Sequence, residues 1–179
     1  MKIAINGFGR IGRHAFKIAF QKKLDIVGIN DLTDTKTLAH LLKHDTAYND
    51  FPFPVSYDDK HIIVKGKKIP VFAEKDPAVL PWKQLKVDVV IESTGRFTDA
   101  ESAKAHITAG AKKVVISAPG KGDLKTYVRG VNDKEYKGEP ILDNASCTTN
   151  CAAPMMLVLE KEFGIEKAML TTVHSYTAS

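Results

Sequence analysis

Two cysteines stand four positions apart in the sequence DNASCTTNCAAP, residues 143 to 154. The spacing of apolar residues predicts a helix from Thr148 to Phe163, which puts Cys147 at the first turn and Cys151 one turn further in. Unpaired backbone N–H groups and the positive end of the helix dipole favour a thiolate at the start of a helix, and this effect fades within one turn. The spacing therefore indicates that Cys147 is a nucleophile and that Cys151 is a small buried packing residue.

A nucleophilic cysteine generally needs a base, and the next histidine along the chain is His174, in MLTTVHSYT. A helix of about 16 residues covers roughly 24 Å, at ~1.5 Å per residue. If the chain turns at Gly164 and returns as an extended strand, residues 168 to 174 cover about 23 Å, at ~3.3 Å per residue. His174 would then lie level with Cys147, so the lengths permit a Cys-His pair.

Other interpretations of these residues are weaker. A zinc site needs four ligands, whereas C-x-x-x-C with one histidine supplies three, so we expect no metal site. A disulfide would join two side chains that run nearly parallel up one helical face, which is poor geometry for the bond. Simple packing remains the alternative for Cys147, and a hydrogen-bonded histidine within a sheet is the alternative for His174.

A second group of residues suits a phosphate. The segment NGFGRIG places Gly7, Gly9 and Gly12 in the spacing G-x-G-x-x-G, between a predicted strand and a predicted helix. Such glycines permit a tight turn and let backbone N–H groups approach a pyrophosphate. Asp31 follows the next strand, where a carboxylate would accept hydrogen bonds from an adenosine ribose and repel a 2'-phosphate, so NAD is favoured over NADP. A turn that serves only packing, with Asp31 as a capping residue, is the alternative.

The elements that must position these groups alternate along the chain. Short, nearly continuous apolar runs predict strands covered on both faces, and amphipathic stretches between them predict helices. The expected strands are residues 2–6, 25–30, 87–93 and 112–119, and the expected helices are residues 10–22 and 99–109. Residues 50–75 predict short antiparallel strands at one edge, with turns at Asp58-Asp59 and Lys65-Gly66. We therefore expect an α/β fold with a Rossmann-type, doubly wound, mainly parallel sheet.

Composition narrows the class of protein. The chain has 179 residues, of which 44% are hydrophobic and 26% charged, as in globular proteins. The formal net charge of +5 comes from lysines scattered singly or in short groups, so we expect no nucleic-acid partner. The sequence has no run of about 18 apolar residues, which a membrane span would require, and we expect a cytoplasmic protein. Two cysteines are too few for a disulfide framework.

Six motifs together give the chain a close resemblance to one family. They are NGFGRIGR at 6–13, INDL at 29–32, ESTGRFT at 92–98, ISAP at 116–119, NASCTTNC at 144–151 and TTVHSYT at 171–177. The chain resembles phosphorylating glyceraldehyde-3-phosphate dehydrogenases of the bacterial, NAD-preferring kind. The family's chains are nearly twice as long, so we expect a fragment of such an enzyme.

The resemblance implies a role for each matching residue. Cys147 would be the nucleophile and His174 its base. The cofactor NAD would lie against Gly7, Gly9, Arg10, Ile11 and Gly12 at the pyrophosphate, Asp31 at the ribose, Thr94, Gly95 and Phe97 at the adenine, and Ser117 at the nicotinamide. Lys75 stands where arginine is usual in the cofactor site. Ser146, Thr148 and Thr177 would contact phosphate groups.

The resemblance also implies a reaction and a domain organisation. The reaction would be the glycolytic oxidation of glyceraldehyde 3-phosphate with inorganic phosphate to 1,3-bisphosphoglycerate, through a thioester on Cys147. Erythrose 4-phosphate is an alternative substrate, and an NAD-binding or interaction module without activity is an alternative function. Residues 1–146 would form the NAD-binding domain, and residues 147–179 would begin a truncated α+β catalytic domain, with its active-site helix and first strand. The full-length protein would be a homotetramer.

Overall fold

A single sheet carries the fold in the computed structural model, which describes residues 1–174. Its eight strands lie in the order β3-β4-β5-β2-β1-β6-β7-β8. Their bounds are β1 Lys2–Asn6, β2 Asp25–Asn30, β3 Val55–Asp58, β4 His61–Val64, β5 Lys67–Phe72, β6 Val89–Glu92, β7 Lys113–Ile116 and β8 Ile141–Asp143. All neighbours from β5 to β8 are parallel, and β3 and β4 add an antiparallel edge. The predicted Rossmann-type, mainly parallel α/β fold is confirmed.

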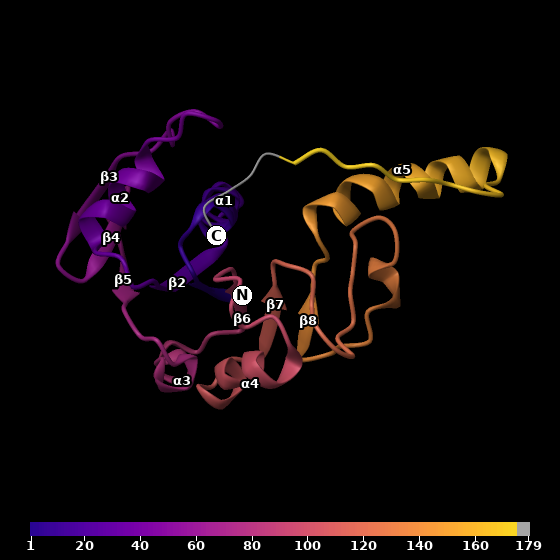
Figure 1. The fold of residues 1–179 in the computed structure, drawn as a ribbon. Coiled ribbons are helices and arrows are strands. Elements are labelled where there is room, and N and C mark those ends of the chain that lie inside the picture. The colour runs from indigo at the N-terminus through magenta and orange to yellow at the C-terminus, as the bar shows by residue number, and fades with distance from the viewer. Residues whose placement is uncertain (175–179) are drawn as a thin grey trace.

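The helices lie on both sides of this sheet, with α1 and α2 opposite α3 and α4 (Figure 1). Their bounds are α1 Arg10–Gln21, α2 Thr35–Lys43, α3 Trp82–Leu85, α4 Ala100–Thr108 and α5 Cys147–Phe163, with short 3-10 turns at Pro77–Val79 and Asp133–Glu135. The two helices expected over residues 10–22 and 99–109 are α1 and α4. Helix α2 was not predicted from the sequence, although Asp34 accepts a hydrogen bond from Thr37 N at 2.9 Å as its N-cap.

Alternate residues of the central strand β1 face opposite sides of the sheet, and both sides are covered. Ile5 packs with Phe16 and Leu42 of α1 and α2. Ala4, its neighbour in β1, packs with Trp82 and other residues of the second apolar cluster. Burial on both faces explains why the strand sequences are apolar almost throughout.

The last helix, α5, extends away from the sheet, and the chain then runs back along it (Figure 1). None of the residues of α5 is buried. The strand expected over residues 168–174 is not formed, because an extended segment becomes a strand only when a neighbour pairs with its backbone, and the described residues place none beside it. Across residues 1–174, no helix is both long and apolar enough to cross a membrane.

Candidate functional site

A cavity of about 270 Å³ opens at the carboxyl ends of β1, β2 and β6. In open parallel sheets, ligands bind at this edge. The cavity is lined by Asn6, Gly7, Gly9, Asn30, Asp31, Leu32, Glu74, Lys75, Ser93, Thr94, Arg96 and Phe97. The fold thus brings together six of the residues that the sequence analysis assigned to a cofactor: Gly7, Gly9, Asp31, Lys75, Thr94 and Phe97.

The three glycines of the turn after β1 differ in what surrounds them. Gly7 has a φ of +89°, and a Cβ there would lie 2.6 Å from the backbone nitrogen of Thr94. A Cβ on Gly12 would lie 2.0 Å from the carbonyl oxygen of Gly7. A Cβ on Gly9 would meet no atom of the described chain within 4 Å. Gly7 and Gly12 are therefore needed for close packing, whereas Gly9 leaves the cavity side of the turn open to a ligand.

The start of α1 is suited to an anion. Gly9 is its N-cap residue, and no side chain within the described residues caps it. Arg10, Ile11 and Gly12 form the first turn, whose backbone N–H groups have no partner within the helix. Such a helix start attracts phosphate oxygens, so the pyrophosphate of a dinucleotide fits this turn.

The side chain of Arg13, in α1, is hydrogen-bonded to the backbone of the glycine turn. Its Nη1 donates to the carbonyl oxygen of Phe8 at 3.0 Å. Partial burial lowers the pKa of Arg13, while the carboxylates of Asp45 and Asp31 oppose that shift. The guanidinium stays charged at neutral pH and adds positive charge beside the turn.

Asp31 joins the end of β2 to the glycine turn. Its Oδ2 accepts a hydrogen bond from Phe8 N at 2.7 Å, and its Oδ1 accepts one from Thr33 N at 2.9 Å. Each carboxylate oxygen can accept a second hydrogen bond. The side chain is thus held in place at the cavity wall and retains acceptor capacity for the hydroxyl groups of a ribose.

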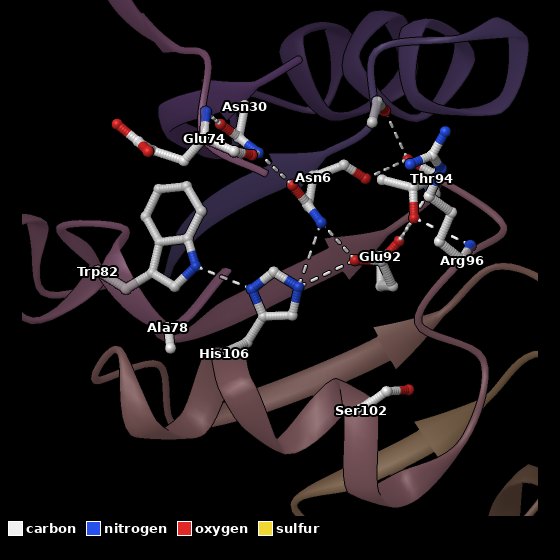
Figure 2. A network of polar contacts seen from close by, with 12 residues as sticks. Asn6, Asn30, Glu74, Ala78, Trp82, Glu92, Thr94, Arg96, Ser102 and His106 are labelled. Carbon is white, nitrogen blue, oxygen red and sulfur yellow. Dashed lines mark hydrogen bonds and ion pairs between the residues drawn. The ribbon is translucent and has the colours of Figure 1, made fainter. Parts of the chain in front are cut away.

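Beneath the cavity lies a network of buried polar side chains (Figure 2). Glu92, at the end of β6, is only 1% exposed and accepts four hydrogen bonds. Its Oε2 accepts from Asn6 Nδ2 at 2.6 Å and pairs with His106 Nε2 at 2.9 Å. Its Oε1 accepts from the backbone nitrogen of Thr94 at 2.8 Å and from the Thr94 hydroxyl at 2.5 Å. Four donors satisfy an ionised carboxylate, which would otherwise be costly to bury.

The network continues to the neighbouring strand. Asn30 Nδ2 donates to Asn6 Oδ1 at 2.7 Å and to the carbonyl oxygen of Glu74 at 2.9 Å. The backbone nitrogen of Glu74 donates to Asn30 Oδ1 at 2.8 Å. These contacts tie the ends of β1 and β2 to the segment after β5, which carries Lys75 to the rim of the cavity.

Five buried residues of this network were not predicted from the sequence: Asn6, Asn30, Trp82, Glu92 and His106. A signal existed for three of them, since Asn6, Asn30 and Glu92 each end a strand that is otherwise mostly apolar. A polar residue at the carboxyl end of a buried parallel strand faces the ligand edge of the sheet. No comparable sequence signal pointed to Trp82 and His106, because each could equally have been a residue packed against an apolar surface without a role in a polar network.

The cysteine site begins at a strained turn. Ala145 has a φ of +60°, and its backbone nitrogen donates to the buried Asp143 Oδ1 at 2.8 Å. Ser146 is the N-cap of α5, because its Oγ accepts from Thr149 N at 3.0 Å. Cys147 is therefore the first residue of α5, and Cys151 follows one turn later.

Both cysteines are free thiols and both are exposed. The prediction that Cys151 is buried is wrong in this structure, because its side chain is exposed and no residue of α5 is buried. The returning chain brings His174 to the first turn of α5, where its Nε2 lies 3.1 Å from Thr148 Oγ1. Among the hydrogen bonds of residues 1–174, His174 contacts Thr148 rather than Cys147.

The remaining predicted residues are spread around these two sites. Ser117 follows β7, and its backbone nitrogen donates to the carbonyl oxygen of Glu92 at 2.9 Å. Gly95 lies in the exposed turn after β6 with a φ of +72°. Thr177 lies outside the described residues. Within residues 1–174, no three His, Cys, Asp or Glu side chains are grouped as a metal site would require.

Comparison with known proteins gives two family matches along the chain. Residues 1–100 match the glyceraldehyde 3-phosphate dehydrogenase NAD binding domain, and residues 146–179 match the C-terminal domain of the same family. The boundary that we predicted between residues 146 and 147 stays a prediction.

Individual relatives carry the same name. The chain is 56% identical over 180 residues to glyceraldehyde-3-phosphate dehydrogenase of Thermotoga maritima, covering 98% of this chain and 54% of the relative. It is 54% identical over 183 residues to that of Borreliella burgdorferi, covering 99% and 55%. It is 50% identical over 180 residues to the cytosolic protein of Trypanosoma brucei brucei, covering 100% and 54%. The chain spans about half the length of these relatives.

Proposed function

The chain belongs to the glyceraldehyde 3-phosphate dehydrogenase family, and we propose that it carries the NAD site and the nucleophile of a phosphorylating aldehyde dehydrogenase. The substrates would be glyceraldehyde 3-phosphate and inorganic phosphate, and the product 1,3-bisphosphoglycerate. We expect the full-length enzyme to act in glycolysis as a cytoplasmic homotetramer.

One observation carries the cofactor part of this proposal: the glycine turn, the uncapped start of α1 and Asp31 meet at one cavity. The backbone N–H groups of Arg10, Ile11 and Gly12 would bind the pyrophosphate. Asp31 would accept hydrogen bonds from the adenosine ribose, and its charge would disfavour a 2'-phosphate. Thr94, Gly95 and Phe97 would flank the adenine, with Lys75 at the rim and Ser117 towards the nicotinamide.

The chemistry would start at Cys147. Its thiolate attacks the aldehyde carbon, and the oxyanion that forms takes a proton from water to give a hemithioacetal. NAD, when bound, supplies the acceptor for the hydride that leaves this carbon. His174 takes the hydroxyl proton of the hemithioacetal, which leaves a thioester on Cys147. An oxygen of inorganic phosphate then attacks the thioester carbonyl, and the thiolate of Cys147 leaves.

The other residues of the cysteine site would bind and orient. Ser146, Thr148 and Thr177 would hold phosphate groups through their hydroxyls. The first-turn N–H groups of α5 would stabilise the negative charge that develops on the reacting oxygen. The 3.1 Å contact between Thr148 Oγ1 and His174 Nε2 supports a base at this end of α5.

A second candidate function is an NAD-binding module without turnover. The exposed apolar side chains of α5 and the segment after it favour this alternative, since they leave the cysteine site open to water. Met155, Val158 and Phe163 are 55%, 59% and 82% exposed.

Two measurements test the proposal. Calorimetric titration of the 179-residue chain with NAD should show one site, and Asp31→Ala should weaken it; a chain that binds no NAD would refute the cofactor assignment. NADH formation from glyceraldehyde 3-phosphate and phosphate then separates the two candidates, since turnover refutes a pure binding module. In a full-length protein, Cys147→Ser should abolish NADH formation, and parallel kinetics with erythrose 4-phosphate should identify the better substrate.

A further inference from the structure

The buried network beneath the cavity has a fixed direction of hydrogen bonding. The indole Nε1 of Trp82 can only donate, and it lies 3.0 Å from Nδ1 of His106. Nδ1 must therefore be the acceptor, so the proton of the neutral imidazole sits on Nε2 and is donated to Glu92 Oε2 at 2.9 Å. Both rings are fully buried, so water cannot take over either contact.

Glu92 is consequently an acceptor at both of its oxygens. Oε2 faces two donors, the Nε2 proton of His106 and the amide of Asn6. Oε1 faces the backbone N–H of Thr94 at 2.8 Å, so it too receives a donor that cannot be reversed. A proton on either carboxylate oxygen would point at a donor, so neither oxygen can carry one. The Thr94 hydroxyl can therefore pair with Oε1 only by donating its own proton.

That pairing determines what Thr94 can offer to a ligand. Its hydroxyl proton is donated to Glu92 Oε1 at 2.5 Å, and Oγ1 accepts from the backbone nitrogen of Arg96 at 3.1 Å (Figure 2). A hydroxyl has one proton and two lone pairs. Thr94 lines the cavity, so it can turn only its second lone pair towards the interior.

We propose that Glu92 makes Thr94 a hydrogen-bond acceptor towards the cavity, so that the cavity selects a purine with an exocyclic amino group over a purine with a carbonyl there. Glu92 acts through Thr94 and is a positioning residue. The inference rests on the proposed function, in which the adenine lies against Thr94 and Phe97. An amino group would donate to Oγ1, whereas the carbonyl of hypoxanthine would oppose it lone pair to lone pair.

The wild-type chain allows a direct test with two dinucleotides. NAD and nicotinamide hypoxanthine dinucleotide differ only in the purine. NAD carries the exocyclic amino group, whereas the hypoxanthine dinucleotide carries a carbonyl there and a proton on the neighbouring ring nitrogen. We expect NAD to bind roughly tenfold more tightly, because its amino group forms a hydrogen bond with Thr94 Oγ1 where the carbonyl of the other dinucleotide makes a repulsive contact. Equal affinities would overturn the inference and leave the NAD site intact. Failure of both dinucleotides to bind would refute the proposed function, and the inference with it.

Glu92→Gln should reverse the preference. At the Oε2 position the amide nitrogen of the substituted side chain would meet two fixed donors, from Asn6 and His106, whereas at the Oε1 position it meets only one, the backbone N–H of Thr94, so it takes the place of Oε1. It then donates to Thr94 Oγ1, whose hydroxyl proton is free to turn into the cavity and meet a carbonyl. The ratio of the two dissociation constants should fall to one or below, and this ratio does not depend on the fraction of chain that is folded. A ratio unchanged from wild type would overturn the inference.

Variants of Thr94 give a test that leaves Glu92 in place. Thr94→Val removes the hydroxyl and should bring the two affinities together, whereas Thr94→Ser keeps it and should retain the preference for NAD. Glu92→Gln added to Thr94→Val should leave the ratio where Thr94→Val alone put it. Glu101→Gln, an exposed carboxylate-to-amide change in the first turn of α4, is the matched control and should behave as wild type. Selectivity that survives in Thr94→Val would contradict the proposal.

Discussion

Trp82 donates its indole N–H to Nδ1 of His106 across 3.0 Å, where neither side chain has any exposed surface. The contact joins α3 to α4, two helices on the same side of the sheet. It also leaves the other ring nitrogen of His106 to pair with Glu92 below the cavity. Stability of the core and order at the nucleotide cavity therefore depend on the same imidazole.

Replacing His106 should be costly for stability. His106→Leu leaves the indole N–H of Trp82 without an acceptor and removes one of the four donors to Glu92, so we expect a loss of about 3 kcal/mol in the free energy of unfolding. Urea denaturation followed by the fluorescence of Trp82, the one tryptophan in the chain, measures it. His44→Leu is the matched control, because the His44 side chain is 53% exposed and should change stability by less than about 0.5 kcal/mol. A similar small loss for both variants would contradict the role of the network.

Alanine at two glycines of the turn should separate packing from ligand binding. Gly12→Ala places a Cβ against the backbone oxygen of Gly7, so it should lower the free energy of unfolding by about 3 kcal/mol. Gly9→Ala meets no protein atom and has an ordinary φ of −71°, so the chain should keep its stability. Gly9 lines the cavity, however, so the added methyl group should weaken NAD binding. Thermal unfolding and NAD titration of both variants check this; equal loss of stability would refute it.

The two thiols should react at different rates although both are exposed. Cys147 is the first residue of α5, where unpaired N–H groups favour a thiolate, and Cys151 lies beyond the reach of that effect. Iodoacetamide near neutral pH should therefore modify Cys147 several-fold faster, as peptide mass spectrometry can measure. In urea the two rates should converge, because the helix is lost. Equal rates in the folded chain would count against the helix-start argument.

Acid should remove the contribution of Asp45 to stability. A hydrogen bond from Lys17 Nζ, 2.9 Å away, and backbone N–H groups lower the pKa of Asp45 from 3.8 to about 2. Because the folded-state pKa is the lower one, the carboxylate stabilises the fold above about pH 4, and this stabilisation disappears as the pH falls towards about 2. Asp45→Asn should therefore be less stable than wild type at about pH 6, with the difference closing near pH 2. Asp123→Asn, at an exposed carboxylate, should show no such pH-dependent gap.

Sequence patterns predicted the parts of the fold that neighbouring residues determine. The glycine turn, Asp31 after β2 and the place of Cys147 at the first turn of α5 all follow from local spacing, because strand and helix periods place those residues. Asn6, Asn30 and Glu92 could also have been predicted from their places at strand ends.

Other features depend on residues that are distant in sequence. The pairing of Trp82 with His106 joins two helices that the sequence does not place side by side. The burial of Cys151 and a strand over residues 168–174 were predicted wrongly for one reason: both require a partner surface that buries this end of the chain, and no residue of α5 is buried. The roles of Cys147, His174 and the cofactor residues stay predictions until the experiments above are done.

The place of β1 between β2 and β6 has a consequence for the order of events during synthesis. One side of β1 pairs with β2, the next strand in the chain, but its other side pairs with residues 89–92. A ribosome adds about 5–20 residues each second, so the central strand waits several seconds with an open edge. During that time its apolar residues and unpaired backbone are accessible to chaperones or to a second nascent chain. The earliest strand thus completes its pairing only after the partners of β2, β3, β4 and β5 have all been made.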